Sequence, residues 1–275
     1  MARIVSYHSI VADDGGLTAL YRSMDVNYPK FFKMDRMSKA GFLGAETVLG
    51  EAGLRNEEPK EDLSIVLVNS TSSTVDDIEF QKSIGPQEYF PSPSLFVYTL
   101  SNVVCGEIAI RNRILGETSF YVKEAFDAAF LARAVRWAFA DPAIKKVLCG
   151  WTECLTGDRV CHMMLVEREG TGDLDLTAET IEKTIKSHTQ MEELKQEIKK
   201  QIIESLNLDM APEDIANNEP LFGDTGLGLD SVDALELIVI MEKFYGIKLT
   251  DPSQSKGILQ SIDTMSEYVA THRTK

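Results

Sequence analysis

Residues Gly226–Glu236 form the stretch that most constrains the fold of this chain, and they read Gly-Leu-Gly-Leu-Asp-Ser-Val-Asp-Ala-Leu-Glu. A glycine loop runs into Asp230 and Ser231, either of which can cap a helix by accepting the free amide hydrogens of its first turn. The apolar residues at positions i, i+3 and i+7 share one helix face: Val232, Leu235 and Val239. Outside this stripe lie Asp233 and Glu236, and acids are favoured near a helix start. Taken alone, Ser231 is an ordinary helix cap at an exposed, acidic N-terminus.

A wider context gives this serine a second interpretation. The stretch Pro220–Leu237 resembles the phosphopantetheine attachment site of acyl carrier proteins, and Glu242–Leu249 (Glu-Lys-Phe-Tyr-Gly-Ile-Lys-Leu) resembles the end of that family's second helix. The resemblance covers roughly residues 190–273, a whole carrier domain. It implies that Ser231, with Asp230 in the same site, carries 4′-phosphopantetheine, whose thiol holds an acyl chain. A phosphopantetheinyl transferase is then an implied partner.

The charge of the chain is strongly acidic, with a formal net charge of −15. Residues 191–275 hold 16 acids and 8 bases, a balance of −8, whereas the other 190 residues hold 27 acids and 20 bases, a balance of −7. An acidic surface repels nucleic acid and anionic membranes, and it attracts partners with basic patches. We therefore expect no nucleic acid partner, and we expect three acids to bind basic patches on partner enzymes: Asp233, Glu236 and Glu242.

The cysteines are few and scattered, at positions 105, 149, 154 and 161, without a Cys-x-x-Cys pair. This usage predicts free, structural thiols in a reducing compartment. Even with His162 beside Cys161, the spacing matches no zinc motif, so no metal site is predicted. We find no basic start with an apolar segment and no run of about 18 apolar residues. The sequence therefore predicts a cytoplasmic protein without a membrane span.

The first part of the chain alternates between strand and helix patterns. Strands are predicted at 2–10, 64–68, 118–122, 147–151 and 160–167, the last as a possible hairpin partner of the one before it. Helices are predicted at 35–50, 74–83, 95–111 and 123–140. A turn is predicted at 13–16 and an aromatic loop at 28–33. This alternation predicts an α/β layer with helices on the faces of a sheet.

The C-terminal part has a helical pattern instead. A Gly- and Asp-rich segment with a charged helical extension predicts a linker at 171–189, between a domain at 1–170 and a domain at 190–275. A first carrier helix is predicted at 192–206, with four apolar residues in register: Leu194, Ile198, Ile202 and Leu206. The last helix is predicted near 261–272. Together these helices predict an all-α four-helix carrier bundle.

Two segments of the first domain resemble a β-ketoacyl synthase. They are Pro91–Asn102, continued by Gly106–Ile110 and Gly116, and Val147–Glu153 (Val-Leu-Cys-Gly-Trp-Thr-Glu). The resemblance covers about residues 1–168. It implies an α/β domain equivalent to the N-terminal half of a thiolase-type fold.

The residues that carry catalysis in that family are missing from the matching positions. The family's nucleophilic cysteine follows the strand predicted at 118–122, where this chain reads Tyr-Val-Lys-Glu-Ala-Phe-Asp with Ala125 nearest the nucleophile position. Without a thiolate no acyl-enzyme intermediate forms. The histidines (His8, His162, His188 and His272) match neither active-site motif. No catalytic residue is predicted, and Cys105 is interpreted as a buried structural thiol.

Three interpretations of the function remain: a carrier protein, an interaction subunit resembling a chain-length factor, and a condensing or decarboxylating synthase component working with a partner subunit. The first two are compatible, because a tethered carrier is held at high effective concentration near a docked partner. We therefore predict an acyl carrier fused to a catalytically inert ketosynthase-like domain, serving fatty acid or polyketide-type elongation. Its expected partners are a β-ketoacyl synthase and other acyl-processing enzymes. A lone half domain also predicts a homo- or heterodimer that covers the apolar helix at 123–140.

Overall fold

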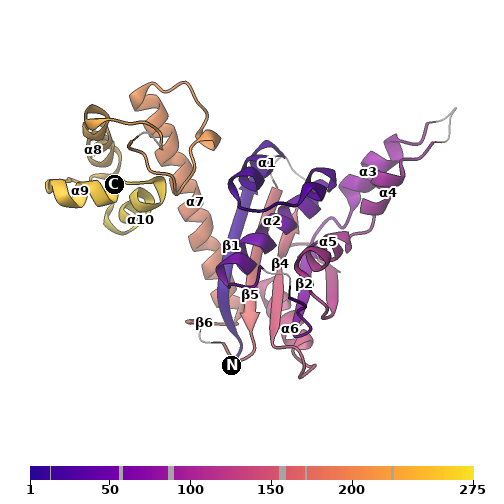
Figure 1. Ribbon diagram of the computed structural model, residues 1–275. Helices are drawn as coiled ribbons and strands as arrows, with labels where there is room; N and C mark the ends of the chain where they lie inside the picture. Colours follow the sequence, from indigo (N-terminus) through magenta and orange to yellow (C-terminus); the bar gives the residue numbers. More distant parts are fainter. Residues whose placement is uncertain (13, 56–57, 86–89, 155–158, 171, 224–225) are drawn as a thin grey trace. The chain divides into compact units, whose positions relative to one another are not determined.

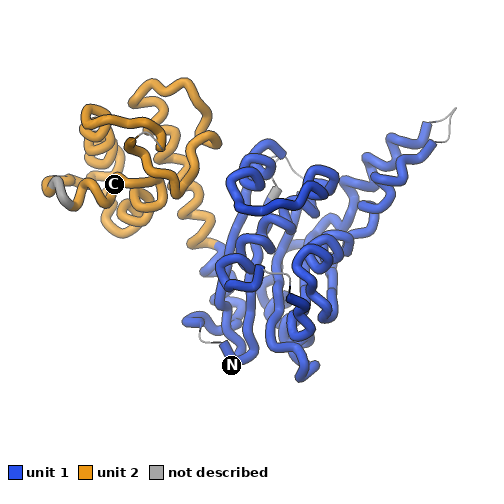
Figure 2. Tube along the Cα trace, viewed as in Figure 1, with its two compact units in different colours: residues 1–185 blue, residues 186–275 orange. Residues whose placement is uncertain are grey.

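A computed structural model describes the chain except for residues 13, 56–57, 86–89, 155–158, 171 and 224–225. The chain divides into two compact units, Met1–Ile185 and Lys186–Lys275 (Figure 2). Each unit has its own hydrophobic core. The domain and linker boundaries expected from the sequence remain a prediction.

The N-terminal unit is built on a mixed sheet. Within the described residues the strand order is β3-β2-β4-β5-β1-β6. β2 pairs in parallel with both β3 and β4, whereas β4–β5, β5–β1 and β1–β6 pair antiparallel. The predicted hairpin of β4 and β5 is therefore confirmed. The strands are β1 (Arg3–Ala12), β2 (Leu63–Asn69), β3 (Thr118–Val122), β4 (Lys146–Glu153), β5 (Arg159–Glu167) and β6 (Leu174–Asp175).

Helices cover both faces of this sheet (Figure 1). Alternate side chains of β2 point to opposite faces, as the two-residue period of a strand requires: Leu63, Ile65 and Leu67 join one core cluster, and Val66 and Val68 join the other. The first cluster is covered mainly by α1 (Asp14–Ser23), α2 (Arg36–Glu51) and α5 (Val103–Asn112), and the second by α6 (Ala128–Ala138) and the start of α7 (Ala178–Leu206). Three short helices complete the unit: η1 (Pro29–Lys33), α3 (Thr74–Lys82) and α4 (Pro93–Tyr98).

Several local predictions are wrong. A turn was expected at 13–16, but helix α1 already begins at Asp14, and residue 13 is outside the described residues. The helix forms because Leu17 and Tyr21 bury one side of it in the core. The aromatic loop at 28–33 contains the 3₁₀-helix η1. The helix expected at 95–111 is two helices, α4 and α5, separated by a turn at 99–102. Inside the expected linker, β6 pairs with Arg3 and Ile4 of β1.

The C-terminal unit is helical. Its elements are the second part of α7, η2 (Pro212–Asp214), α8 (Ser231–Tyr245), α9 (Pro252–Ile258) and α10 (Ile262–His272). The predicted first carrier helix is part of α7, which runs without a break through the charged extension. Leu194, Ile198 and Ile202 are buried as predicted, and they pack in one cluster with residues of α8 and α10. The fold class, an α/β domain followed by a helical bundle, is therefore confirmed. No helix among the described residues is long and apolar enough to cross a membrane.

Candidate functional site

The start of α8 is fixed by a reciprocal cap in which Asp230, not Ser231, is the N-cap. The Asp230 Oδ1 atom accepts hydrogen bonds from the amides of Val232 at 2.6 Å and Asp233 at 3.2 Å. In return, the Asp233 Oδ2 atom accepts one from the Asp230 amide at 2.8 Å. This capping box satisfies amides that would otherwise lack a partner at the helix start. The alternative left open by the sequence is thus settled, and the Ser231 hydroxyl is not needed to begin the helix.

Ser231 is the first residue of α8 and is exposed. Within the described part of the chain its hydroxyl makes no hydrogen bond, so it is available to another molecule. The partial positive charge of a helix N-terminus stabilises a nearby anion. A serine ester of a phosphate at this position would keep its negative charge beside the α8 amides. The residues present therefore fit a phosphate-linked prosthetic group.

A glycine loop positions this serine by folding back onto the preceding segment. The Leu227 amide donates to the Pro220 carbonyl at 3.1 Å, and the Leu229 amide donates to the Leu221 carbonyl at 3.1 Å. The side chains of Leu221 and Leu229 are buried in the core of the unit. A Cβ atom on Gly226 would overlap the Pro220 carbonyl oxygen, so this residue has to be glycine. The loop is therefore anchored immediately before Asp230 and Ser231.

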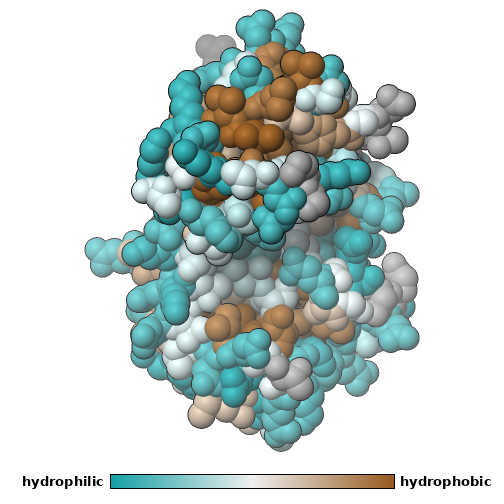
Figure 3. Space-filling model, turned by 90° about the vertical axis from the view of Figure 1, so that its left-hand side faces the viewer, coloured by the Kyte–Doolittle hydropathy of each residue, from teal (hydrophilic) through white to brown (hydrophobic). Residues whose placement is uncertain are grey.

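Helix α8 has apolar residues on both of its sides. Leu237, Ile240 and Met241 are buried in the core of the unit. The apolar stripe recognised in the sequence faces outward instead, with exposed fractions of 67% for Val232, 62% for Leu235 and 51% for Val239. Figure 3 shows apolar residues gathered on the surface of the C-terminal unit. Contiguous exposed apolar residues are typical of interaction sites.

The three predicted partner-binding acids lie on the same helix but differ in availability. Asp233 is half-buried, and its carboxylate is used in the capping box. Glu242 is exposed and forms an ion pair with Lys248 at 3.3 Å. Glu236 is exposed, and no ion pair to it is found among the described residues. Glu236 is therefore the carboxylate most available to a basic partner.

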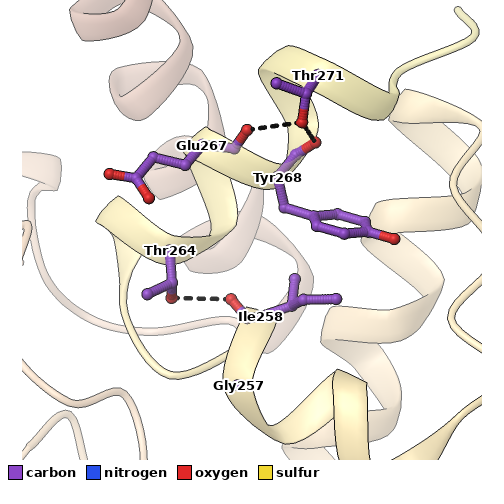
Figure 4. Close-up of a pocket in the computed structure, with 6 residues that line it drawn as sticks. All are labelled: Gly257, Ile258, Thr264, Glu267, Tyr268 and Thr271. Atoms are coloured by element: carbon purple, nitrogen blue, oxygen red, sulfur yellow. Dashed lines mark hydrogen bonds between the residues drawn. The ribbon is translucent and has the colours of Figure 1, made fainter.

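A shallow depression lies between α9 and α10 (Figure 4). Its threonine hydroxyls are bonded inside the protein: Thr264 Oγ1 of α10 donates to the Ile258 carbonyl of α9 at 2.9 Å, and Thr271 Oγ1 donates to the carbonyls of Glu267 and Tyr268 in its own helix at 3.1 Å. No lining residue comes from α8 or from the loop before it. We therefore assign the depression no part in the candidate site.

The cysteines of the N-terminal unit do not form a reactive thiol site. All four are buried, and none of them forms a disulfide within the described residues. Burial raises the pKa of the Cys105, Cys149 and Cys161 thiols to about 12, so these three are protonated near neutral pH. The interpretation of Cys105 as a buried residue is confirmed. Ala125, which the sequence comparison placed nearest the expected nucleophile position, is exposed between β3 and α6.

The structure also brings together polar groups that the sequence did not indicate. The Glu153 carboxylate at the end of β4 accepts hydrogen bonds from the hydroxyls of Ser70 and Thr71, both at 2.5 Å. Burial alone would raise the pKa of Glu153, but these hydrogen bonds outweigh burial and hold it below the usual value. His162 Nδ1 lies 2.8 Å from the buried Ser9 Oγ. No group of three His, Cys, Asp or Glu side chains able to hold a metal ion is found in the described ranges.

Comparison with known proteins gives the class of the C-terminal unit. Residues 196–269 match the family described as phosphopantetheine attachment site. This chain therefore contains a phosphopantetheine-binding domain, which implies a 4′-phosphopantetheine prosthetic group. Helix α8 and the glycine loop lie entirely inside the matched residues.

Solved structures similar to this chain are ketosynthases, some of them in complexes. One is a ketosynthase with its chain length factor from Xenorhabdus doucetiae, with a TM-score of 0.45, 12% identity, and coverage of 62% of this chain and 80% of the other. A second is the ishigamide ketosynthase/chain length factor, with a TM-score of 0.48, 14% identity and 63% coverage of both chains. A third is a type II polyketide synthase acyl carrier protein in complex with its ketosynthase, with a TM-score of 0.45, 9% identity and 74% coverage of both chains.

Proposed function

We propose that this chain is an acyl carrier that bears 4′-phosphopantetheine on Ser231. The observation that carries the proposal is the exposed Ser231 hydroxyl, which has no hydrogen bond to any described residue, at the capped start of α8 inside the matched domain. A phosphopantetheinyl transferase would join Ser231 Oγ to the phosphorus of the phosphopantetheine part of coenzyme A. The bond to adenosine 3′,5′-bisphosphate breaks, and the serine proton passes to a base of the transferase. Ser231 thereby gains a flexible arm whose thiol can hold an acyl group.

The experiment that tests the proposal is incubation of the full chain with coenzyme A and a transferase of broad specificity. Intact mass should rise by one phosphopantetheinyl group, and peptide mass spectrometry should place that group on Ser231. An unmodified Ser231 peptide, with a competent carrier protein modified in the same mixture, would refute the proposal. Modification of a different serine would show that another site carries the arm.

We further propose that the N-terminal unit is an inert ketosynthase-like subunit for docking in polyketide- or fatty acid-type elongation. The resemblance of residues 91–116 and 147–153 to ketosynthases supports this role. The exposed Ala125 in place of a nucleophile and the protonated buried thiols support its inertness. Its proposed partners are an active ketosynthase and other acyl-processing enzymes, in a homo- or heterodimer. The free, buried cysteines fit the reducing cytoplasm as its location.

The alternative, a condensing activity of its own, has a direct test. The modified chain is incubated with acyl and malonyl thioesters, and product is measured with and without an added ketosynthase. We expect β-ketoacyl product only when the ketosynthase is present. Product formation by the chain alone would establish a nucleophile in this protein, and Cys105 would be the first residue to replace.

The acidic side of α8 yields a prediction about partner recognition. Replacing Glu236 and Glu242 with lysine should slow modification by the transferase several-fold at low salt, because charged surfaces steer association. The difference should shrink at high salt, where exposed charges are screened. These two acids are better targets than Asp233, since replacing Asp233 also removes the return bond of the capping box, in which its carboxylate accepts from the Asp230 amide. Initial rates of modification at several salt concentrations measure the effect.

A matched control keeps the change in net charge while leaving α8 intact. Glu204 and Glu213 are exposed acids of the same unit outside α8, so their double lysine variant reproduces the change in charge. It should be modified at nearly the rate of the unaltered chain. Equal slowing of both variants would mean that overall charge matters and that α8 has no special role.

A further inference from the structure

The N-terminal unit carries an aromatic and basic surface on the outer side of α6. It consists of Lys123, Phe130, Arg133 and Trp137, and we call it the α6 surface. Phe130, Arg133 and Trp137 are spaced i, i+3 and i+7, which places them on one side of the helix. Trp137 is 53% exposed, although so large an aromatic side chain is usually well buried. Leu131 and Val135 of the same helix are buried against the sheet.

The side chains of the α6 surface form one connected group. The Lys123 ammonium lies 4.8 Å from the centre of the Phe130 ring. The Arg133 guanidinium lies 5.6 Å from the centre of Phe130 and 5.7 Å from that of Trp137. The two rings pack edge to face with their centres 6.1 Å apart. Such contacts hold both cations over the rings.

These cations are not neutralised by acids of the unit. Among the described residues, neither Lys123 nor Arg133 forms an ion pair with a carboxylate. Asp127, the acid on the same element, accepts a hydrogen bond from the Phe130 amide at 2.8 Å as the cap of α6. In a chain with a net charge of −15, the α6 surface is positive and aromatic, and neither of its cations has an acidic partner among the described residues. Arginine and tryptophan dominate binding energies at protein interfaces.

We propose that the α6 surface binds the outer side of α8 from a second copy of this chain. That side of α8 presents an aliphatic stripe of Val232, Leu235 and Val239, with Glu236 and Glu242 as exposed acids. Aliphatic side chains fit against Trp137 and Phe130, and the acids complement Lys123 and Arg133. The proposal rests on one part of the proposed function, namely that the carrier docks through α8. It adds the partner surface that this face meets.

The expected interaction is weak and reversible. Exposed ion pairs contribute little each, so the binding energy comes mainly from burial of the aromatic and aliphatic side chains. A weak contact suits a carrier that also has to reach other enzymes. Since Ser231 precedes Val232 directly, binding would bring the serine of one molecule to the α6 surface of another.

The experiment is a charge swap measured by sedimentation velocity on full chains across a range of concentrations. One variant carries Lys123→Glu and Arg133→Glu, and a second carries Glu236→Lys and Glu242→Lys. Each variant alone should have its self-association weakened by about tenfold or more, because like charges then face each other. A mixture of the two should associate again, since acids on α6 of one variant then meet bases on α8 of the other. Trp137→Ala should weaken association by about tenfold and should not be rescued by mixing.

The controls separate this contact from effects of folding and net charge. Arg22 and Lys33 are exposed bases of the same unit, so Arg22→Glu with Lys33→Glu reproduces the charge change and should leave association unchanged. Ser231→Ala should also associate normally, so a failure of the phosphopantetheine proposal would not affect this result. Three results would each overturn the inference. They are association that survives both charge reversals, a mixture of the variants that does not associate, and an unaltered chain that stays monomeric at all concentrations.

Discussion

Replacing Ser231 with alanine should abolish loading with phosphopantetheine while leaving the stability of the C-terminal unit within about 0.5 kcal/mol of the unaltered chain. The substitution removes only the hydroxyl group, which makes no hydrogen bond among the described residues. Asp230 and Asp233 keep the capping box, because their bonds do not involve Ser231. Alanine also has a higher intrinsic helix propensity than serine. Intact mass measures the loading, and hydrogen exchange at the amides of α8 and α10 measures the stability of the C-terminal unit by itself.

A comparison with Asp230→Ala sharpens this result. That variant retains the hydroxyl but loses the cap, which typically costs about 1 kcal/mol. It should be less stable than Ser231→Ala and should still accept the prosthetic group, at a reduced rate. If Ser231→Ala lowered stability as much as Asp230→Ala, the serine would have a capping role that the structure does not show. Loading that persisted in Ser231→Ala would refute the assignment of the site.

Local patterns were sufficient for much of the fold. The strand at 118–122 and the helices near 35–50 and 74–83 were predicted because periodicity and caps act within a few residues. The errors have a different origin. Helix α1 is stable because Leu17 and Tyr21 are buried by distant residues, a gain that Asp14-Gly15-Gly16 does not reveal. Strand β6 depends on Arg3 and Ile4, which are remote in sequence.

At the candidate site, too, the local sequence pattern of α8 was not sufficient to predict which residues are buried. Periodicity showed that Val232, Leu235 and Val239 share a side of the helix, but it does not determine which side is buried. Helix α8 is apolar almost all round, so two stripes compete for the core. The stripe with Leu237 and Ile240 is buried, because it meets the apolar sides of α7 and α10. The exposed stripe remains available for binding, and this is a conclusion that only the structure supports.

Polar groups joined across long sequence distances could not be predicted at all. Glu153 and Ser70 are 83 residues apart, and Ser9 and His162 are 153 residues apart. Each pair meets because segments that are remote in sequence lie side by side in the fold, and nothing in the sequence around one residue of a pair indicates the other. Ser231 was different, because its glycine loop, cap and helix are contiguous. A site made from one continuous segment can be recognised from the sequence, whereas a site assembled by topology cannot.

Replacing Gly226 with alanine should damage the loop that positions Ser231, although it adds only one methyl group. The new carbon would overlap the Pro220 carbonyl oxygen, which also accepts the Leu227 amide. Backbone cannot move aside as a flexible side chain can, so the loop has to open. Opening would separate Leu229 from Leu221, whose side chains are buried together in the core. We expect a local loss of about 2–3 kcal/mol, typical of overpacking at a tight site.

Because the chain has two units, a single unfolding curve would mix their transitions, and a local measurement is better. Hydrogen exchange at the amides of α8 and α10 should accelerate in Gly226→Ala, and loading of Ser231 should slow in parallel. Gly257→Ala is the matched control, since no described atom outside the adjoining backbone of α9 lies within 4 Å of the added carbon. It should leave exchange unchanged or slow it, as alanine favours a helix over glycine by up to about 1 kcal/mol. Normal protection and normal loading in Gly226→Ala would show that this loop neither stabilises the unit nor positions the serine.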